Sequence, residues 1–174
     1  MRAGTLFCGV WACLVGVLVI GGCVATTTSV AVPPPSRWVD QGSGAFATSQ
    51  GRVFQGIGSA SGLQSSLLLR ASADNQARSA AAGVLNRYIE RLAAASGLSS
   101  SDTGMMDTLI QAGMSDAIIV DHWQDPQDQT FYSLCRLALT AFKKRLVADN
   151  DIDQAQRNAL LSHADSVHAA MTTP

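Results

Sequence analysis

Three patterns of hydrophobic spacing follow one another along the chain. An unbroken apolar run covers residues 10–20. Apolar and small residues then recur at close to helical spacing over residues 64–96, which predicts one long helix. Loosely alternating stretches at 52–59, 117–123 and 130–139 contain Val, Ile, Phe or Tyr, and they predict three β-strands.

Turn and capping residues divide these segments. Residues 125–129, with the sequence DPQDQ, favour a turn that joins the last two predicted strands as a hairpin. Gly97 is expected to end the long helix, and Asp151 is the expected N-cap of the last helix. Three shorter helices are expected, at about 101–112, 140–148 and 152–171.

The apolar run at the N-terminus has the features of a lipoprotein signal peptide. Arg2 supplies a positive charge before it, and the Gly-Gly-Cys motif that ends at Cys23 resembles the lipobox of bacterial lipoproteins. We therefore predict that residues 1–22 are cleaved and that Cys23 carries palmitate-type acyl chains. An uncleaved membrane helix over 6–25 is the alternative, because its length approaches that of a membrane span.

The predicted lipid anchor is followed by a short spacer. Residues 23–37 are rich in threonine and proline, and Pro33 to Pro35 should be extended, so this segment is a tether. Residues 38–174 form the predicted domain, with a C-terminal helical extension from about residue 140. Val24 stands where an aspartate would retain a lipoprotein in the inner membrane, which predicts the outer membrane with the domain facing the periplasm.

Charge and cysteine content narrow the classes of function. The net charge is −1 and 14% of residues are charged, so the chain lacks the basic footprint of a nucleic-acid-binding protein. After cleavage only Cys23 and Cys135 remain, and lipidation of Cys23 excludes an intramolecular disulfide. The domain must then depend on its hydrophobic core for stability.

Residues 54–62, FQGIGSASG, are the most suggestive candidate for a nucleotide site. Gly56 and Gly58 match the first two glycines of a dinucleotide-binding loop, but Ser61 occupies the third position. A helix of about thirty residues follows, where that motif requires a return to a parallel strand. The segment is therefore predicted to have a structural role where a strand ends and a helix begins.

Metal sites are not predicted. Asp149, Asp151 and Asp153 alternate as in a calcium loop, but Gln154 and Leu160 occupy the positions that require glycine and glutamate, so helix capping is favoured. The three histidines lack the spacing of a zinc site and are interpreted as surface or interface groups. They are His122, His163 and His168.

No catalytic constellation stands out in the sequence. No serine lies in a nucleophile-elbow motif. Cys135 alternates with Ser133 and Leu137 on one face of its strand, which indicates a small buried side chain rather than a nucleophile. We predict that the protein is not an enzyme and uses no cofactor. A Ser, a His and an Asp clustered in a cleft would reopen the alternative of a hydrolase.

Four motifs follow the lipobox between residues 36 and 139. They are SRWV at 36–39, GIGSA at 56–60, RASADNQAR at 70–78, and VDHWQD at 120–125 paired with TFYSLCRL at 130–137. Together they resemble the Lpp-twenty family of small bacterial lipoproteins, which includes the FlgP-type flagellar lipoproteins of the outer membrane.

The resemblance implies a compact α+β domain in which helices pack on one face of a small antiparallel sheet. Combined with the predicted elements, the expected fold is a three-stranded antiparallel sheet with the long helix and shorter helices on one face, plus a C-terminal helix. The resemblance also implies a non-catalytic role, since FlgP-type members assemble into a disk-like structure around the flagellum.

The expected function is that of an outer-membrane lipoprotein with a structural or assembly role. It would bind the membrane through its lipid anchor and bind proteins, either copies of itself or flagellar components. Trp38, Trp123 and Tyr132 are candidate interface residues, because aromatic residues are enriched in binding hot spots, although core packing is an equal claim on each. The alternative is a lipid-anchored activator or scaffold for a cell-envelope enzyme.

Overall fold

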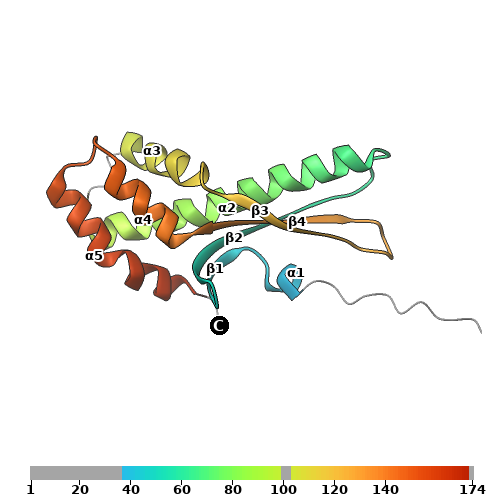
Figure 1. Cartoon of the computed structure of the whole chain (residues 1–174), viewed down its shortest axis with the longest axis horizontal. Coiled ribbons are helices and arrows are strands. Elements are labelled where there is room, and N and C mark those ends of the chain that lie inside the picture. The colour runs from blue at the N-terminus through green and yellow to red at the C-terminus, as the bar shows by residue number, and fades with distance from the viewer. Residues whose placement is uncertain (1–36, 99–102, 173–174) are drawn as a thin grey trace, which may run out of the picture. The chain divides into compact units, whose positions relative to one another are not determined.

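The computed structural model describes residues 37–98 and 103–172. Within these residues four strands form one antiparallel sheet and five helices accompany it, which confirms the α+β class. The predicted signal peptide, Cys23 and all but the last residue of the tether lie outside the described residues. Figure 1 shows the arrangement of the described elements.

The sheet has one strand more than the sequence predicts. Its strands are ordered β1-β2-β4-β3, and each neighbouring pair is antiparallel. The prediction of three strands is wrong because β1 is short and its sequence GAFAT has one large apolar residue, too few to show alternation. The strands are β1 (Gly44–Thr48), β2 (Gly51–Ala60), β3 (Ile118–Gln124) and β4 (Phe131–Ala138).

The helices are close to the predicted ones, with one addition. The five-residue helix α1 was not predicted, and the long helix α2 packs along β2 and β4 (Figure 1). The helices are α1 (Arg37–Gln41), α2 (Ser66–Ala95), α3 (Thr103–Met114), α4 (Leu139–Ala148) and α5 (Gln154–Met171).

Two glycines allow α2 to lie directly on the sheet. A Cβ atom at Gly56 would stand 2.2 Å from the backbone nitrogen of Ala81, and one at Gly58 would stand 2.2 Å from that of Ala77. Such contacts are too short for any side chain, so the strand and the helix backbone meet directly. Gly56 and Gly58 thus have a packing role, and they lie inside β2 rather than at its end.

The core lies between α2, the sheet and the C-terminal helices. Tyr88 of α2 is at its centre, with its ring centroid 4.7 Å from that of Phe54 and 5.5 Å from that of Phe142. Its hydroxyl donates a hydrogen bond of 3.0 Å to the backbone carbonyl of Ala164. Since Ala164 belongs to α5, the C-terminal extension is part of the same core.

Helix ends follow local chemistry with one shift from the prediction. Gly97 has a φ of +72° and ends α2, while the amides of Gly97 and Leu98 bond to the carbonyls of Ala94 and Ala93. The N-cap of α5 is Asp153 rather than the predicted Asp151. Among residues 37–98 and 103–172, no helix combines the length and apolar character needed to cross a membrane.

Candidate functional site

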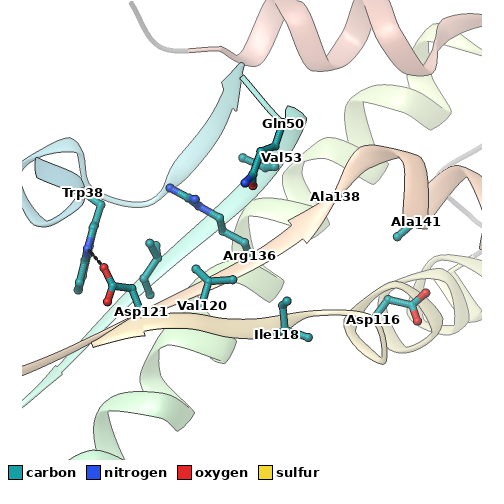
Figure 2. A pocket seen from close by; sticks show the side chains of 11 residues that line it. Trp38, Gln50, Val53, Asp116, Ile118, Val120, Asp121, Arg136, Ala138 and Ala141 are labelled. Atoms are coloured by element: carbon teal, nitrogen blue, oxygen red, sulfur yellow. Dashed lines mark hydrogen bonds between the residues drawn. The ribbon is translucent and has the colours of Figure 1, made fainter. Parts of the chain in front are cut away.

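The face of the sheet opposite α2 carries a groove of about 560 Å³. Cys135 and Leu137 of β4 belong to the core beneath α2, so the alternating residues Leu134 and Arg136 project to the opposite face. Figure 2 shows the groove from close by. Its lining comes from α1, the four-stranded sheet and the ends of α3 and α4, and includes Trp38, Gln50, Val53, Asp116, Ile118, Val120, Asp121, Leu134, Arg136, Ala138 and Ala141.

Trp38 forms one end of the groove. Its indole Nε1 donates a hydrogen bond of 2.8 Å to Oδ2 of Asp121, which fixes α1 against β3 (Figure 2). Only 8% of the Trp38 side chain is exposed. The predicted interface residue therefore lies in the candidate site, where most of its surface contributes to packing.

Trp123 and Tyr132 lie on the same face of the sheet as the groove. They are directly paired across β3 and β4, with ring centroids 5.4 Å apart and an interplanar angle of 36°. The alternation of β4 places Tyr132 on the side of Leu134, away from α2. The structure thus brings all three predicted aromatic residues to one face, but only Trp38 lines the groove.

Arg136 is the one positively charged residue that lines the groove, and the sequence reasoning missed it. Its Nε and Nη2 donate hydrogen bonds of 3.2 and 3.1 Å to Oε1 of Gln55. Gln55 is 1% exposed, and its amide nitrogen donates in turn to the carbonyl of Gly42. A buried neutral amide therefore holds the guanidinium in place. Strand alternation, which put Cys135 inside, would have put Arg136 on the opposite face.

Two carboxylates at the rim of the groove already have donors. Asp116 accepts two hydrogen bonds of 2.7 Å from Nε and Nη2 of Arg145, and this pairing lowers the pKa of the Asp116 carboxyl. Asp121 accepts from Trp38 and also from the backbone amide of His122. Among the ion pairs of the described residues, none includes Arg136.

A Ser, a His and an Asp do meet, on the helix side of the sheet. Ser133 Oγ donates to Oδ1 of Asp74 at 2.6 Å, and His122 Nε2 lies 2.7 Å from the same oxygen. In a catalytic triad the histidine stands between serine and carboxylate, whereas here Asp74 stands between the other two. Ser133 is also wholly buried. The cluster joins α2 to β3 and β4.

Burial and polar contacts act in opposite directions on the pKa of Asp74. Partial burial is the largest single influence and raises the pKa, but the hydrogen bonds from Ser133 and His122, together with nearby positive charge such as that of Arg70, outweigh it and hold the pKa below its usual value. Asp74 is therefore a carboxylate at neutral pH that accepts two hydrogen bonds. This chemistry suits a link between secondary-structure elements.

The structure confirms the prediction for Cys135 and contradicts the one for His168. Cys135 is wholly buried and burial raises the pKa of its thiol, which confirms the predicted small core side chain. The prediction that all three histidines are surface or interface groups is wrong for His168, which is wholly buried. His168 lies on the apolar side of α5 beside Phe54, a position that the sequence pattern around it did not reveal.

Of the three aspartates before α5, Asp153 caps the helix and Asp149 bonds within the preceding turn. Asp153 accepts hydrogen bonds from the amides of Ala155 and Gln156, and Asp149 accepts from the amide of Asp151. In the described part of the chain, no group of three His, Cys, Asp or Glu side chains has the proximity for a metal ion.

Comparisons with known proteins do not supply a family. No protein-family model matches the chain, and no curated protein matches it.

Proposed function

We propose that this protein is an outer-membrane lipoprotein of the Lpp-twenty type, with a structural or assembly role through protein–protein contacts. The observation that carries the proposal is the groove on the open face of the sheet. Its β3 wall leaves Ile118 60% exposed and Val120 41% exposed. Apolar side chains exposed next to one another beside a hollow are typical of sites that bind another molecule.

The position of the groove in the sequence supports the same proposal. Trp38, at one end of the groove, follows directly on the predicted tether of residues 23–37. A chain anchored at Cys23 would then hold its contact surface within a short distance of the bilayer. The FlgP-type resemblance adds flagellar components and copies of the chain as candidate partners.

The proposed mechanism is tethering. A single acyl chain binds membranes only marginally, whereas two or more anchor a protein stably. Confinement beside a membrane raises the local concentration, so weak lateral contacts are occupied without high intrinsic affinity. No bond needs to be made or broken for this function.

Lipidation is tested by replacing Cys23. We expect Cys23→Ala to abolish incorporation of labelled palmitate and to move the protein from the outer-membrane fraction to the soluble fraction. Cys135→Ala is the matched control, because Cys135 is buried in the domain and should leave both readouts unchanged. A Cys23→Ala protein that still sediments entirely with the outer membrane would contradict the proposed anchor.

The contact surface is tested by photo-crosslinking in the native host. A photoreactive amino acid at Val120, in the groove, is expected to capture a discrete partner, and one at Arg91, exposed on α2, is not. Mass spectrometry of the adduct identifies the partner as a second copy, a flagellar component or a cell-envelope enzyme. An enzyme as the captured partner would favour the activator alternative.

A further inference from the structure

We propose that the groove binds an extended peptide segment of a partner protein in which one carboxylate side chain lies between aliphatic residues, with the carboxylate on Arg136. This inference rests on the proposed function, because it names the chemistry of the partner that the same groove would bind.

Arg136 is prepared for an anion. A guanidinium has five N–H donors, and Gln55 accepts two of them, which leaves both hydrogens of Nη1 and one of Nη2. Gln55 is neutral, so the bond orients the guanidinium without cancelling its charge. Two remaining nitrogens in a planar group match the two oxygens of a carboxylate.

Within the described structure, the acidic residues of the groove do not pair with Arg136. Asp116 is paired in bidentate fashion with Arg145, and Asp121 is bonded to Trp38. In Figure 2 the side chain of Arg136 projects from β4 toward the β1–β2 side, while Asp121 and Asp116 lie toward the two ends of the groove. The positive charge of Arg136 therefore faces the groove with no carboxylate among the described residues beside it.

The walls around Arg136 are aliphatic. Ile118 pairs directly across from Arg136, Val120 lies further along β3, and Val53 and Leu134 belong to β2 and β4. Aliphatic side chains of a ligand on either side of its carboxylate would cover Ile118 and Val120. Their burial supplies affinity, while the charged pair supplies specificity.

The free edge of β3 favours a peptide over a compact small molecule. β3 is the last strand of the sheet, and no described strand pairs with its outer edge. The edge at β1, by contrast, meets the C-terminal end of α5 through the bridge between Ala45 and Thr172. A peptide whose acidic residue lies in the groove on Arg136 can continue over β3 to this free edge and bond to it through its backbone, which a compact small molecule cannot do.

The β3 bulge limits the length of such pairing. The register of β3 against β4 shifts between Ile119 and Asp121. Bulges twist an edge strand and shorten the stretch that another strand can follow. The expected ligand is therefore a short segment with a single carboxylate, since one guanidinium faces the groove.

The test selects ligands from a displayed library of random heptapeptides. The full chain, purified in detergent, is the target, and the Arg136→Gln chain is used for counter-selection. We expect the selected peptides to carry Asp or Glu between Val, Ile or Leu. In fluorescence polarisation, Arg136→Gln and the Glu→Gln version of the peptide should each weaken binding by about tenfold or more, the loss of a charge-assisted hydrogen bond.

Two variants separate binding from folding. Ile118→Ser changes a side chain that is mostly exposed, so it should weaken binding without altering thermal unfolding. Arg91→Gln removes an exposed arginine of α2, the helix that covers the opposite face of the sheet from the groove. This change should leave binding unchanged.

Three outcomes would overturn the inference. They are failure to select any peptide, selection of peptides without an acidic residue, and equal affinity for the wild-type and Arg136→Gln chains. Binding of oleate in the groove with no selected peptide would point to a free fatty acid instead. These results leave the Cys23 and crosslinking tests untouched, so failure here and failure of the proposed function are distinguishable.

Discussion

At the residue scale, His168 is the most isolated polar side chain of the core. Its Nε2 lies 3.1 Å from the backbone carbonyl of Val53, which makes Nε2 the protonated nitrogen of a neutral ring. Nδ1 has no hydrogen-bond partner among the described residues. Burial lowers the pKa of His168, because a charged imidazolium between Phe54 and Tyr88 would lose its hydration.

The stability of the protein should therefore fall in mildly acidic solution. A histidine whose pKa is lower in the folded than in the unfolded state does not reduce the free energy of unfolding at pH values above the unfolded pKa of about 6.5. As the pH falls below that value the unfolded chain binds the proton first, so the free energy of unfolding decreases. We expect urea unfolding midpoints to drop between pH 7.5 and pH 5, and His168→Gln to reduce this drop.

His163→Gln is the control for this measurement. His163 lies on the same helix but is exposed, so its replacement should preserve the pH dependence of wild type. A His168→Gln chain that loses as much stability on acidification as wild type would show that another group is responsible.

Gly56 gives a second prediction at this scale. Gly56→Ala would bring a methyl group within 2.2 Å of backbone atoms of α2, which cannot rotate away. We expect a loss of about 3 kcal/mol in the free energy of unfolding. Gly83→Ala, inside α2, would place its methyl group at an ordinary contact distance of 3.8 Å from Nη1 of Arg87, so it should instead stabilise the protein by up to about 1 kcal/mol. Equal effects of the two substitutions in urea denaturation would contradict the direct helix–strand contact.

At the element scale, α5 is held by a cap at its start and by apolar contacts along its length. Leu160, Ala164 and His168 are its buried residues, one turn or slightly more apart. This spacing gives α5 one buried face against α2 and α4. The helix is therefore amphipathic, with one face in the core, and the Asp153 cap sets its first residue.

Asp153 and Asp151 should contribute differently to α5. Asp153→Ala removes the acceptor for two backbone amides and is expected to cost about 1 kcal/mol. Asp151→Ala should cost much less, since no hydrogen bond to the Asp151 carboxylate is present in the described structure. Thermal unfolding followed by circular dichroism measures both, and a larger effect at Asp151 would contradict the observed cap.

At the scale of the whole molecule, the two faces of the sheet have different roles. One face is covered by α2 and contains the core, and the other carries the groove and the paired aromatics Trp123 and Tyr132. The C-terminal extension belongs to the first face, since Tyr88 bonds to Ala164. Its removal should damage the fold rather than the groove alone.

A truncation after Asp149 tests this role. It would expose Tyr88, Phe54 and Phe142, so we expect loss of cooperative urea unfolding and of near-ultraviolet circular dichroism. A chain that begins at Arg37 retains all described elements and should still unfold cooperatively. If the chain truncated after Asp149 unfolded at the wild-type midpoint, the helix would be an appendage to an independent core.

The sequence by itself determined the helices and strands that have a clear hydrophobic period, and the residues at which they end. The long helix, the hairpin strands and the Gly97 end follow from spacing and turn chemistry, which act within a few residues. The lipobox and tether are also sequence features, and they stay predictions because they lie outside the described residues. Short β1 and α1 were missed because their few residues carry no period.

Only the tertiary structure decided which polar side chains lie next to one another. Gln55 and Arg136 are 81 positions apart, and Asp74 and Ser133 are 59 apart, so no local pattern could join them. Likewise, the burial of His168 depends on where α5 docks, and the role of Gly56 depends on where α2 rests. Local energies select helices and strands, but the placement of a side chain in a groove or a core is a property of the packed whole.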